Sequence, residues 1–179
     1  MPVRTRFDWG SLSPRRLLMA VAVIIGLCPM PSVAVEPADT VVAIARFTVW
    51  PDEVDYGLSF RMCLRDDDPA IASFLSLRGT LIHGRPLSLH SVEPGAFGSE
   101  ACQVAFFSSG LAEPSDIQSI SLRPVLTVSA QPGFVKAGGI VEITDPHAED
   151  RLLVSNVTLG RHPLRLRAPL LEVAGRVIE

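Results

Sequence analysis

The acidic triplet at residues 66–68 is the densest group of side chains in the sequence that could hold a metal ion. Neighbouring residues point in different directions, and neither a histidine nor a further carboxylate group stands at ligand spacing from the triplet. Pro69 directly follows Asp68, and an aspartate before a proline is a strong signal for the start of a helix. We therefore interpret the triplet as the cap of a short helix and predict no metal ligand.

The histidines do not form a catalytic arrangement either. No pair of them stands at a spacing typical of metal ligands or of a catalytic triad, and the sequence has no "GxSxG" nucleophile motif. We interpret each as a surface or packing residue: His83, His90, His147 and His162. The sequence thus predicts no catalytic residue and no cofactor, and it indicates a protein that is not an enzyme.

One short stretch could contact a ligand. Ser108, Ser109 and Gly110 follow an apolar segment that is typical of a buried strand. In doubly wound folds the turn after such a strand often faces the ligand crevice. The stretch lacks the glycine pattern of a dinucleotide site. It is therefore a candidate crevice, with ordinary turn geometry as the alternative.

The N-terminal region has the layout of an export signal. Four arginines precede an uninterrupted apolar run at 17–27, and small residues at 32–34 suit a signal peptidase. An uncleaved membrane anchor is the alternative, but the run is shorter than the about 20 residues that span a bilayer. We predict that residues 1–34 are a secretory signal peptide and that 35–179 form a single domain.

Charge and cysteine content narrow the class of protein. The formal net charge is −3, and loss of the arginine-rich leader would make the chain more acidic. Nucleic-acid binding, which needs a basic patch, is therefore not expected. Cys63 and Cys102 remain after the leader is removed. An even pair in an exported protein favours a disulfide, although two buried free thiols would leave the same pattern.

Hydrophobic patterning predicts alternating strands and helices. The first helix, at 37–48, is apolar over most of its circumference and should be buried, with Trp50 and Pro51 ending it. We expect the rings of Phe47 and Trp50 to be buried against a sheet. Further helices are expected at 68–77, 113–121 and 164–178. Strands are expected at 58–64, 87–92, 102–110, 124–129, 140–144 and 151–157.

This order of elements indicates the fold class. Strands that alternate with helices are typical of an α/β protein, with a sheet covered on both faces. The last two expected strands are joined by a polar turn and should pair as a hairpin. We predict a three-layer, Rossmann-like sheet that is mostly parallel, closes on an antiparallel hairpin and carries helices on both faces.

A series of short motifs resembles a known family. In chain order they are "ARFTVWP", "CLRDDDP", "HGRPLSL", "CQVAFF", "PVLTVSAQPGF" and "GGIVEI". Together they resemble the YfiR-like family of bacterial periplasmic proteins, over residues 40–178. The resemblance implies a compact, non-catalytic α/β domain in the periplasm that is often a homodimer. Cys63 and Cys102 match cysteine positions of that family, which supports their pairing.

The resemblance also implies a partner. The best-known member of the family represses an inner-membrane diguanylate cyclase by binding its periplasmic domain, which lowers cyclic di-GMP and disfavours biofilm. We therefore expect a membrane-bound signalling enzyme as the client. A small-molecule-binding sensory module that acts with a histidine kinase or a receptor is the alternative.

The C-terminal region departs from the family pattern and could select the client. There the candidate partner surface consists of Arg161, which precedes the expected final helix, and of Leu164, Arg165 and Arg167, which lie in its first turn. The candidate crevice at 108–110 would serve the alternative function.

Overall fold

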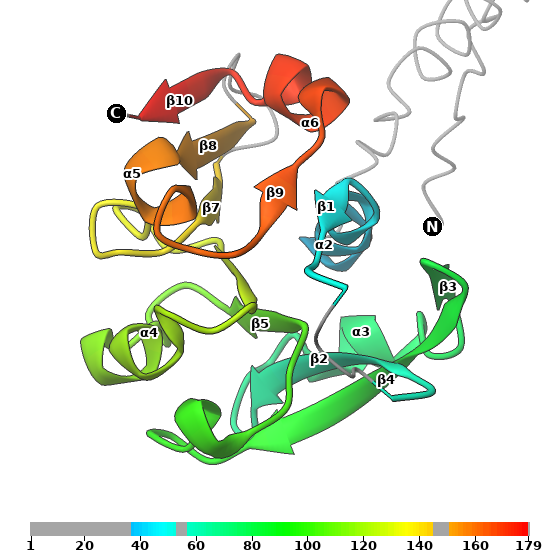
Figure 1. The fold of residues 1–179 in the computed structure, drawn as a ribbon. Helices are drawn as coiled ribbons and strands as arrows, with labels where there is room; N and C mark the ends of the chain where they lie inside the picture. Colours follow the sequence, from blue (N-terminus) through cyan, green and yellow to red (C-terminus); the bar gives the residue numbers. More distant parts are fainter. Residues whose placement is uncertain (1–36, 53–56, 145–150, 179) are drawn as a thin grey trace, which may run out of the picture. The chain divides into compact units, whose positions relative to one another are not determined.

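The structure of the protein is a computed structural model that describes residues 37–52, 57–144 and 151–178 (Figure 1). The signal peptide predicted at 1–34 lies outside the described residues, and so does the polar turn expected before residue 151. No helix within the described ranges is long and apolar enough to cross a membrane.

An eight-stranded sheet forms the centre of the fold (Figure 1). Its strand order is β10-β8-β7-β6-β5-β2-β4-β3. The pairs β4–β2, β2–β5, β5–β6 and β6–β7 are parallel. The pairs β3–β4 and β7–β8 are antiparallel. The strands are β2 (Phe60–Arg65), β3 (Leu81–Ile82), β4 (Arg85–Val92), β5 (Val104–Phe107), β6 (Leu126–Ser129), β7 (Val141–Ile143), β8 (Leu152–Ser155) and β10 (Arg176–Ile178).

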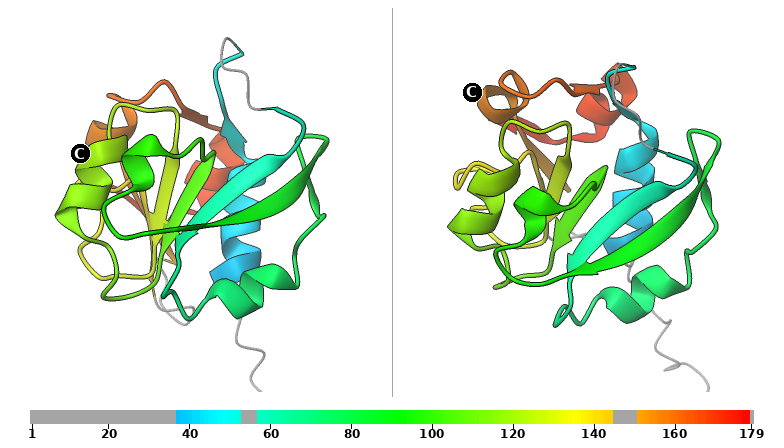
Figure 2. Two further views of the ribbon diagram at one scale, coloured as in Figure 1. Left: turned by 90° about the horizontal axis from the view of Figure 1, so that it is seen from below. Right: turned by 60° about the horizontal axis from the view of Figure 1, so that its bottom comes forward.

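Helices cover both faces of this sheet, as predicted, and Figure 2 shows α2 and α4 on opposite sides of it. Residues of α2, α3 and α6 share one apolar cluster with the sheet, whereas residues of η1 and α4 share a second. The helices are α2 (Pro37–Arg46), α3 (Ile71–Leu75), η1 (Phe97–Ser99), α4 (Pro114–Ile120), α5 (Asn156–Leu159) and α6 (Ala168–Val173).

The central strands divide their side chains between the two clusters. In β5, Val104 and Phe106 enter the first cluster, while Ala105 and Phe107 enter the second. Successive residues of a strand point to opposite faces of the sheet. A strand that is apolar throughout therefore has to be covered on both faces. The three-layer α/β architecture predicted from the sequence is therefore confirmed.

The end of the first helix differs from the sequence expectation. Helix α2 ends at Arg46, and Thr48 and Val49 form the short strand β1 (Thr48–Val49), which pairs with β9 (Arg165–Leu166). Trp50 is buried as expected, but Phe47 is 38% exposed. After the helix, Thr48 is fully buried, and its hydroxyl donates to the Ile44 carbonyl.

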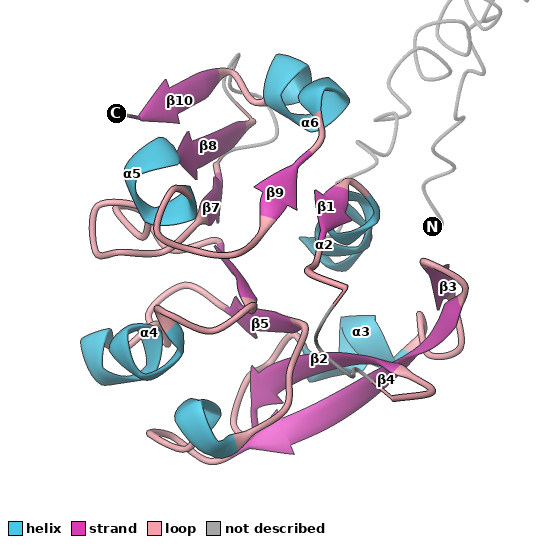
Figure 3. Cartoon of the chain, viewed as in Figure 1, coloured by secondary structure: helices cyan, strands magenta, loops and turns pink. Residues whose placement is uncertain are grey.

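The C-terminal segment is not the single helix that the sequence suggested (Figure 3). It consists instead of β9, α6 and β10. Pro169 lies in the first turn of α6, because proline lacks the backbone N–H that a helix interior requires. Strand β10 pairs in parallel with β8, so the β7–β8 hairpin is confirmed but does not form the edge of the sheet.

Other boundaries move as well. The strand expected at 102–110 is β5 at Val104–Phe107, and the helix expected at 68–77 is α3 at Ile71–Leu75. Strand β2 begins at Phe60, so Leu58 precedes it and is 94% exposed. Strand β8 ends at Ser155 instead of continuing to Val157. The Ser155 hydroxyl accepts a hydrogen bond from the Thr158 backbone N–H and thereby begins α5, which is the usual role of serine at a helix start.

Candidate functional site

The carboxyl ends of β2 and β5 form the place where a doubly wound sheet would bind a ligand. The chain passes from β2 to β4 on one side, and then returns to β5 on the other side of β2. Such a change of direction leaves a crevice beyond the strand ends. Ser108, which follows β5, therefore lies where the sequence analysis expected a crevice.

Asp68 occupies this position with its own carboxylate. The side chain is 3% exposed, and its Oδ1 accepts from the Ser108 hydroxyl at 2.6 Å and from the Ala70 N–H at 2.8 Å. Its Oδ2 accepts from the Ser108 N–H at 3.0 Å. Both donors of Ser108 are therefore engaged within the protein. Asp68 was expected to cap a helix that begins at 68, but α3 begins at Ile71 with Ala70 at its N-cap, and no side chain caps it. The Asp68 carboxylate instead joins the residues before α3 to the end of β5.

The other two residues of the predicted crevice are separated from this carboxylate. Ser109 and Gly110 are exposed, and the Gly110 N–H donates to Gln131 Oε1 at 3.2 Å. The Ala112 N–H donates to the same oxygen at 3.2 Å. The loop after β5 is therefore held by polar groups of the protein itself.

Arg65 fixes the neighbouring strand end. Its side chain is almost buried and forms a bidentate pair with Asp67, with two N···O distances of 2.9 Å. It also donates to Glu113 Oε1 at 2.8 Å and to the Leu111 carbonyl at 3.3 Å. These hydrogen bonds raise the pKa of Arg65 and lower that of Asp67. The guanidinium therefore ties the loops after β2 and β5 together, a role that the sequence analysis missed.

A second buried carboxylic acid, after Asp68, lies in α4 on the side of the second apolar cluster. Asp116 in α4 is fully buried, and its Oδ1 accepts from the Gly95 N–H at 2.7 Å. Its Oδ2 has no hydrogen-bond partner among the residues that the structure describes. Burial raises the pKa of Asp116, and the nearby Glu113 raises it further, while the Gly95 bond and Arg65 act in the opposite direction.

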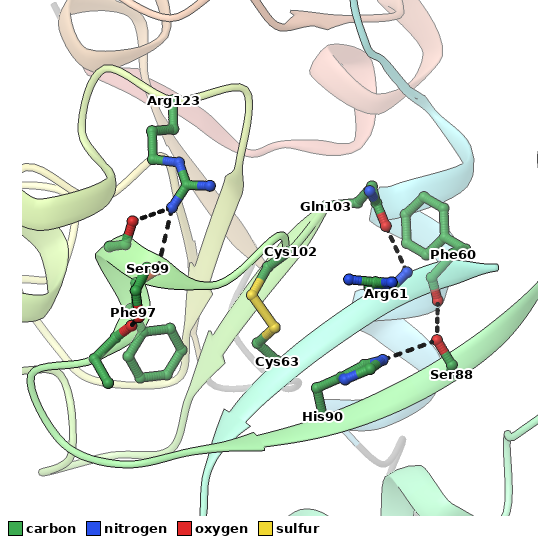
Figure 4. The surroundings of a disulfide bond; sticks show 12 residues. Phe60, Arg61, Cys63, Ser88, His90, Phe97, Ser99, Cys102, Gln103 and Arg123 are labelled. Carbon is green, nitrogen blue, oxygen red and sulfur yellow. Dashed lines mark hydrogen bonds between the residues drawn. A yellow bond between two sulfur atoms is a disulfide. The ribbon is translucent and has the colours of Figure 1, made fainter. Parts of the chain in front are cut away.

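Cys63 and Cys102 are joined by a disulfide (Figure 4). Their Cα atoms are 5.9 Å apart, within the range that disulfides require. The bond joins β2 to the segment that enters β5, inside the second apolar cluster. Its role is therefore structural, since both cysteines are almost fully buried.

Three of the four residues of the candidate partner surface are exposed to solvent. Arg161, Arg165 and Arg167 are exposed, whereas Leu164 is 3% exposed and belongs to the first apolar cluster. Arg165 lies in β9 opposite Val49 of β1, on a small antiparallel ladder rather than on a helix.

No group of three histidine, cysteine, aspartate or glutamate side chains within the described ranges could hold a metal ion. A family model described as YfiR/HmsC-like matches residues 37–175. No curated protein matches the chain significantly.

Proposed function

The chain belongs to the YfiR/HmsC-like family, and we propose that it is a non-catalytic periplasmic regulator of cyclic di-GMP signalling. It binds the periplasmic part of an inner-membrane signalling enzyme, a diguanylate cyclase, and represses it. The family match over residues 37–175 carries this proposal. The Cys63–Cys102 disulfide supports a location in the periplasm, because disulfides persist in oxidising compartments.

The exposed arginines are the surface that we assign to the client. Arg161, Arg165 and Arg167 fall within seven residues, and no acidic residue interrupts them. The chain as a whole is acidic, with a formal net charge of −3. This segment is positively charged and so has the opposite sign to the rest of the chain. Complementary charges steer association and fix the partner. The client should therefore present an acidic surface.

Deleting the gene tests the regulatory role, and complementation tests the surface. Deletion should raise cellular cyclic di-GMP, and the wild-type gene should lower it again. A variant with all three arginines replaced by glutamate should fail to lower it, because like charges would then face each other. Stability should change little, since each exposed substitution usually alters it by less than about 0.5 kcal/mol.

Arg78→Glu is the matched control, because Arg78 is an exposed arginine in a different part of the chain. It should repress like the wild type. Unchanged cyclic di-GMP after deletion would contradict the regulatory role itself. Full repression by the triple variant would instead move the client surface elsewhere.

A further inference from the structure

Strand β4 lies along an edge of the sheet that is only partly covered (Figure 1). One side of β4 pairs with β2 from Leu87 to Val92. On the other side, β3 pairs with Arg85 and Pro86 alone, and Leu87 exchanges backbone hydrogen bonds of 2.9 Å and 3.0 Å with the two residues before β3. Beyond Leu87, no strand within the described ranges pairs with this side of β4.

The directions of the backbone groups identify those that are open. The Leu87 N–H and carbonyl point away from β2, because they bond to residues 80 and 79. Alternate residues of a strand direct their backbone groups to the same side, so the groups of Leu89 and Ser91 also point away from β2. They have no hydrogen-bond partner among the residues that the structure describes. The edge therefore presents two N–H donors and two carbonyl acceptors.

This edge lacks the features that usually keep a sheet edge from pairing. Natural edge strands avoid association through charged side chains, prolines, bulges or short length. The open segment at 88–92, "SLHSV", contains neither a proline nor an acidic or basic residue other than His90. It pairs with β2 without a bulge. At the opposite edge, β10 has only three residues and begins with Arg176. The open segment of β4 is therefore the edge that favours pairing with another strand.

We propose that this open segment pairs with the same segment of a second copy of the chain, as antiparallel strands related by a two-fold axis beside His90. Leu89 of each copy then faces Ser91 of the partner subunit, and the two His90 residues face each other. Residues of antiparallel strands whose backbone groups point toward one another exchange two hydrogen bonds. The two Leu89–Ser91 pairs therefore form four bonds, which use every open group of both edges.

The ends of the open segment favour a second copy over a longer strand. A longer strand laid against β4 would meet the residues that already bond to Leu87. Strand β4 ends at Val92, and the Ala96 N–H donates to the Glu93 carbonyl at 3.0 Å, so the chain turns away there. In the two-fold arrangement Val92 of one copy lies opposite Ser88 of the partner subunit. The turn of each copy therefore comes just before the covered part of the other.

A proline at position 91 tests this pairing. The Ser91 N–H points away from β2, so Ser91→Pro removes an intermolecular donor but no bond to β2, and proline is tolerated in edge strands. Sedimentation equilibrium of the exported protein should give twice the mass of one chain. Ser91→Pro should raise the dissociation constant of the dimer about tenfold or more, because each dimer loses two hydrogen bonds. Ser91→Ala, which retains the N–H, should associate like the wild type.

His90→Glu tests the position of the axis without altering a backbone donor. Residues directly opposite each other in antiparallel strands have Cα atoms about 4.5–5.5 Å apart, so two glutamates would repel each other across the axis. His90→Glu should weaken the dimer at low ionic strength, and added salt should partly restore it because salt screens the repulsion. His90→Gln is the uncharged control and should associate like the wild type.

Amide hydrogen exchange measured by NMR locates the interface in the wild type. Exchange at Leu89 and Ser91 should slow as the protein concentration rises through the dissociation constant of the dimer. Exchange at His90, whose N–H points toward β2, should depend far less on concentration. The pairing does not involve the exposed arginines at 161–167, so it stands independently of the proposed client surface. An exclusively monomeric wild type, a dimer unaffected by Ser91→Pro or His90→Glu, or concentration-independent exchange at Leu89 and Ser91 would overturn the proposal.

Discussion

Trp50 stabilises the end of α2 through ring contacts. It meets Phe60 edge-on at 5.2 Å and His83 at 5.8 Å between ring centroids. Within the described ranges its Nε1 has no hydrogen-bond partner. Its contribution therefore comes from packing. Trp50→Ala should lower the free energy of unfolding by about 3–5 kcal/mol, because it leaves a cavity in the core. Chemical denaturation followed by circular dichroism measures this loss.

A substitution of Phe47 is the control for Trp50→Ala, because this aromatic residue lies three positions away and is 38% exposed. Phe47→Ala should cost only about 1 kcal/mol. Equal losses in the two variants would contradict the different burial of the two rings. A variant of Trp50 that melts like the wild type but loses repression would make Trp50 a binding residue.

Asp116 should make stability depend on pH. Its pKa in the folded protein is raised above the ordinary value of 3.8, chiefly by burial. The folded state therefore holds this proton more tightly than the unfolded state. The stabilisation is complete below the ordinary pKa and is lost as the pH rises through the raised pKa.

Asp116→Asn isolates this effect, because its amide oxygen can still accept from Gly95 but the side chain does not ionise. The melting temperature of the wild type should fall relative to that of the variant as the pH rises from about 4 to about 8. Melting curves of both proteins across this range provide the measurement. A constant difference between them would show that Asp116 keeps its ordinary pKa.

The disulfide joins β2 covalently to the segment that enters β5, in addition to the hydrogen bonds between the two strands. The cysteines are 39 residues apart in sequence, and closing a loop of that length stabilises a fold by about 4 kcal/mol in the chain-entropy model. Reduction with dithiothreitol should lower the melting temperature by about 10 °C. Differential scanning calorimetry with and without the reductant measures this shift.

The double variant Cys63→Ala, Cys102→Ala separates loss of the bond from other effects of the reductant. It should melt near the temperature of the reduced wild type and should not respond to dithiothreitol. Two free thiols found by alkylation of the native protein, together with no shift on reduction, would contradict the disulfide.

The central strands were predictable because their pattern is local. The run at 104–107 is apolar on both faces and could fit only a covered strand. The C-terminal segment was not predictable in the same way, because its strands and its helix have between two and six residues. Such lengths hold too little periodicity to separate a strand from a helix, although Pro169 marked where α6 begins.

The candidate site was predictable only in its position. Strand order places the turn after β5 at the crevice, and the sequence analysis placed Ser108 there. The Asp68 carboxylate that binds Ser108 comes from 40 residues earlier in the chain. A local pattern predicts a cap at Asp68, but it holds no information about a contact between distant segments.

The export signal predicts the first residue of the mature protein. Signal peptidase should cleave after Ala34, so the exported chain should begin at Val35. Intact-mass analysis of the protein from a periplasmic extract checks this expectation. A mass that retains the leader would favour the membrane-anchor alternative and would restrict how far the domain can reach toward its client.

The strand order has a consequence for the order in which the sheet can assemble as the exported chain emerges from the membrane. From β4 onward, every strand pairs with a strand that precedes it in the chain, and none inserts between two strands already paired. A chain that emerges N-terminus first can therefore extend its sheet outward from β2 as each segment arrives. No early pairing between the described strands has to reopen to admit a later one, and β10 is the last of them to join the growing edge.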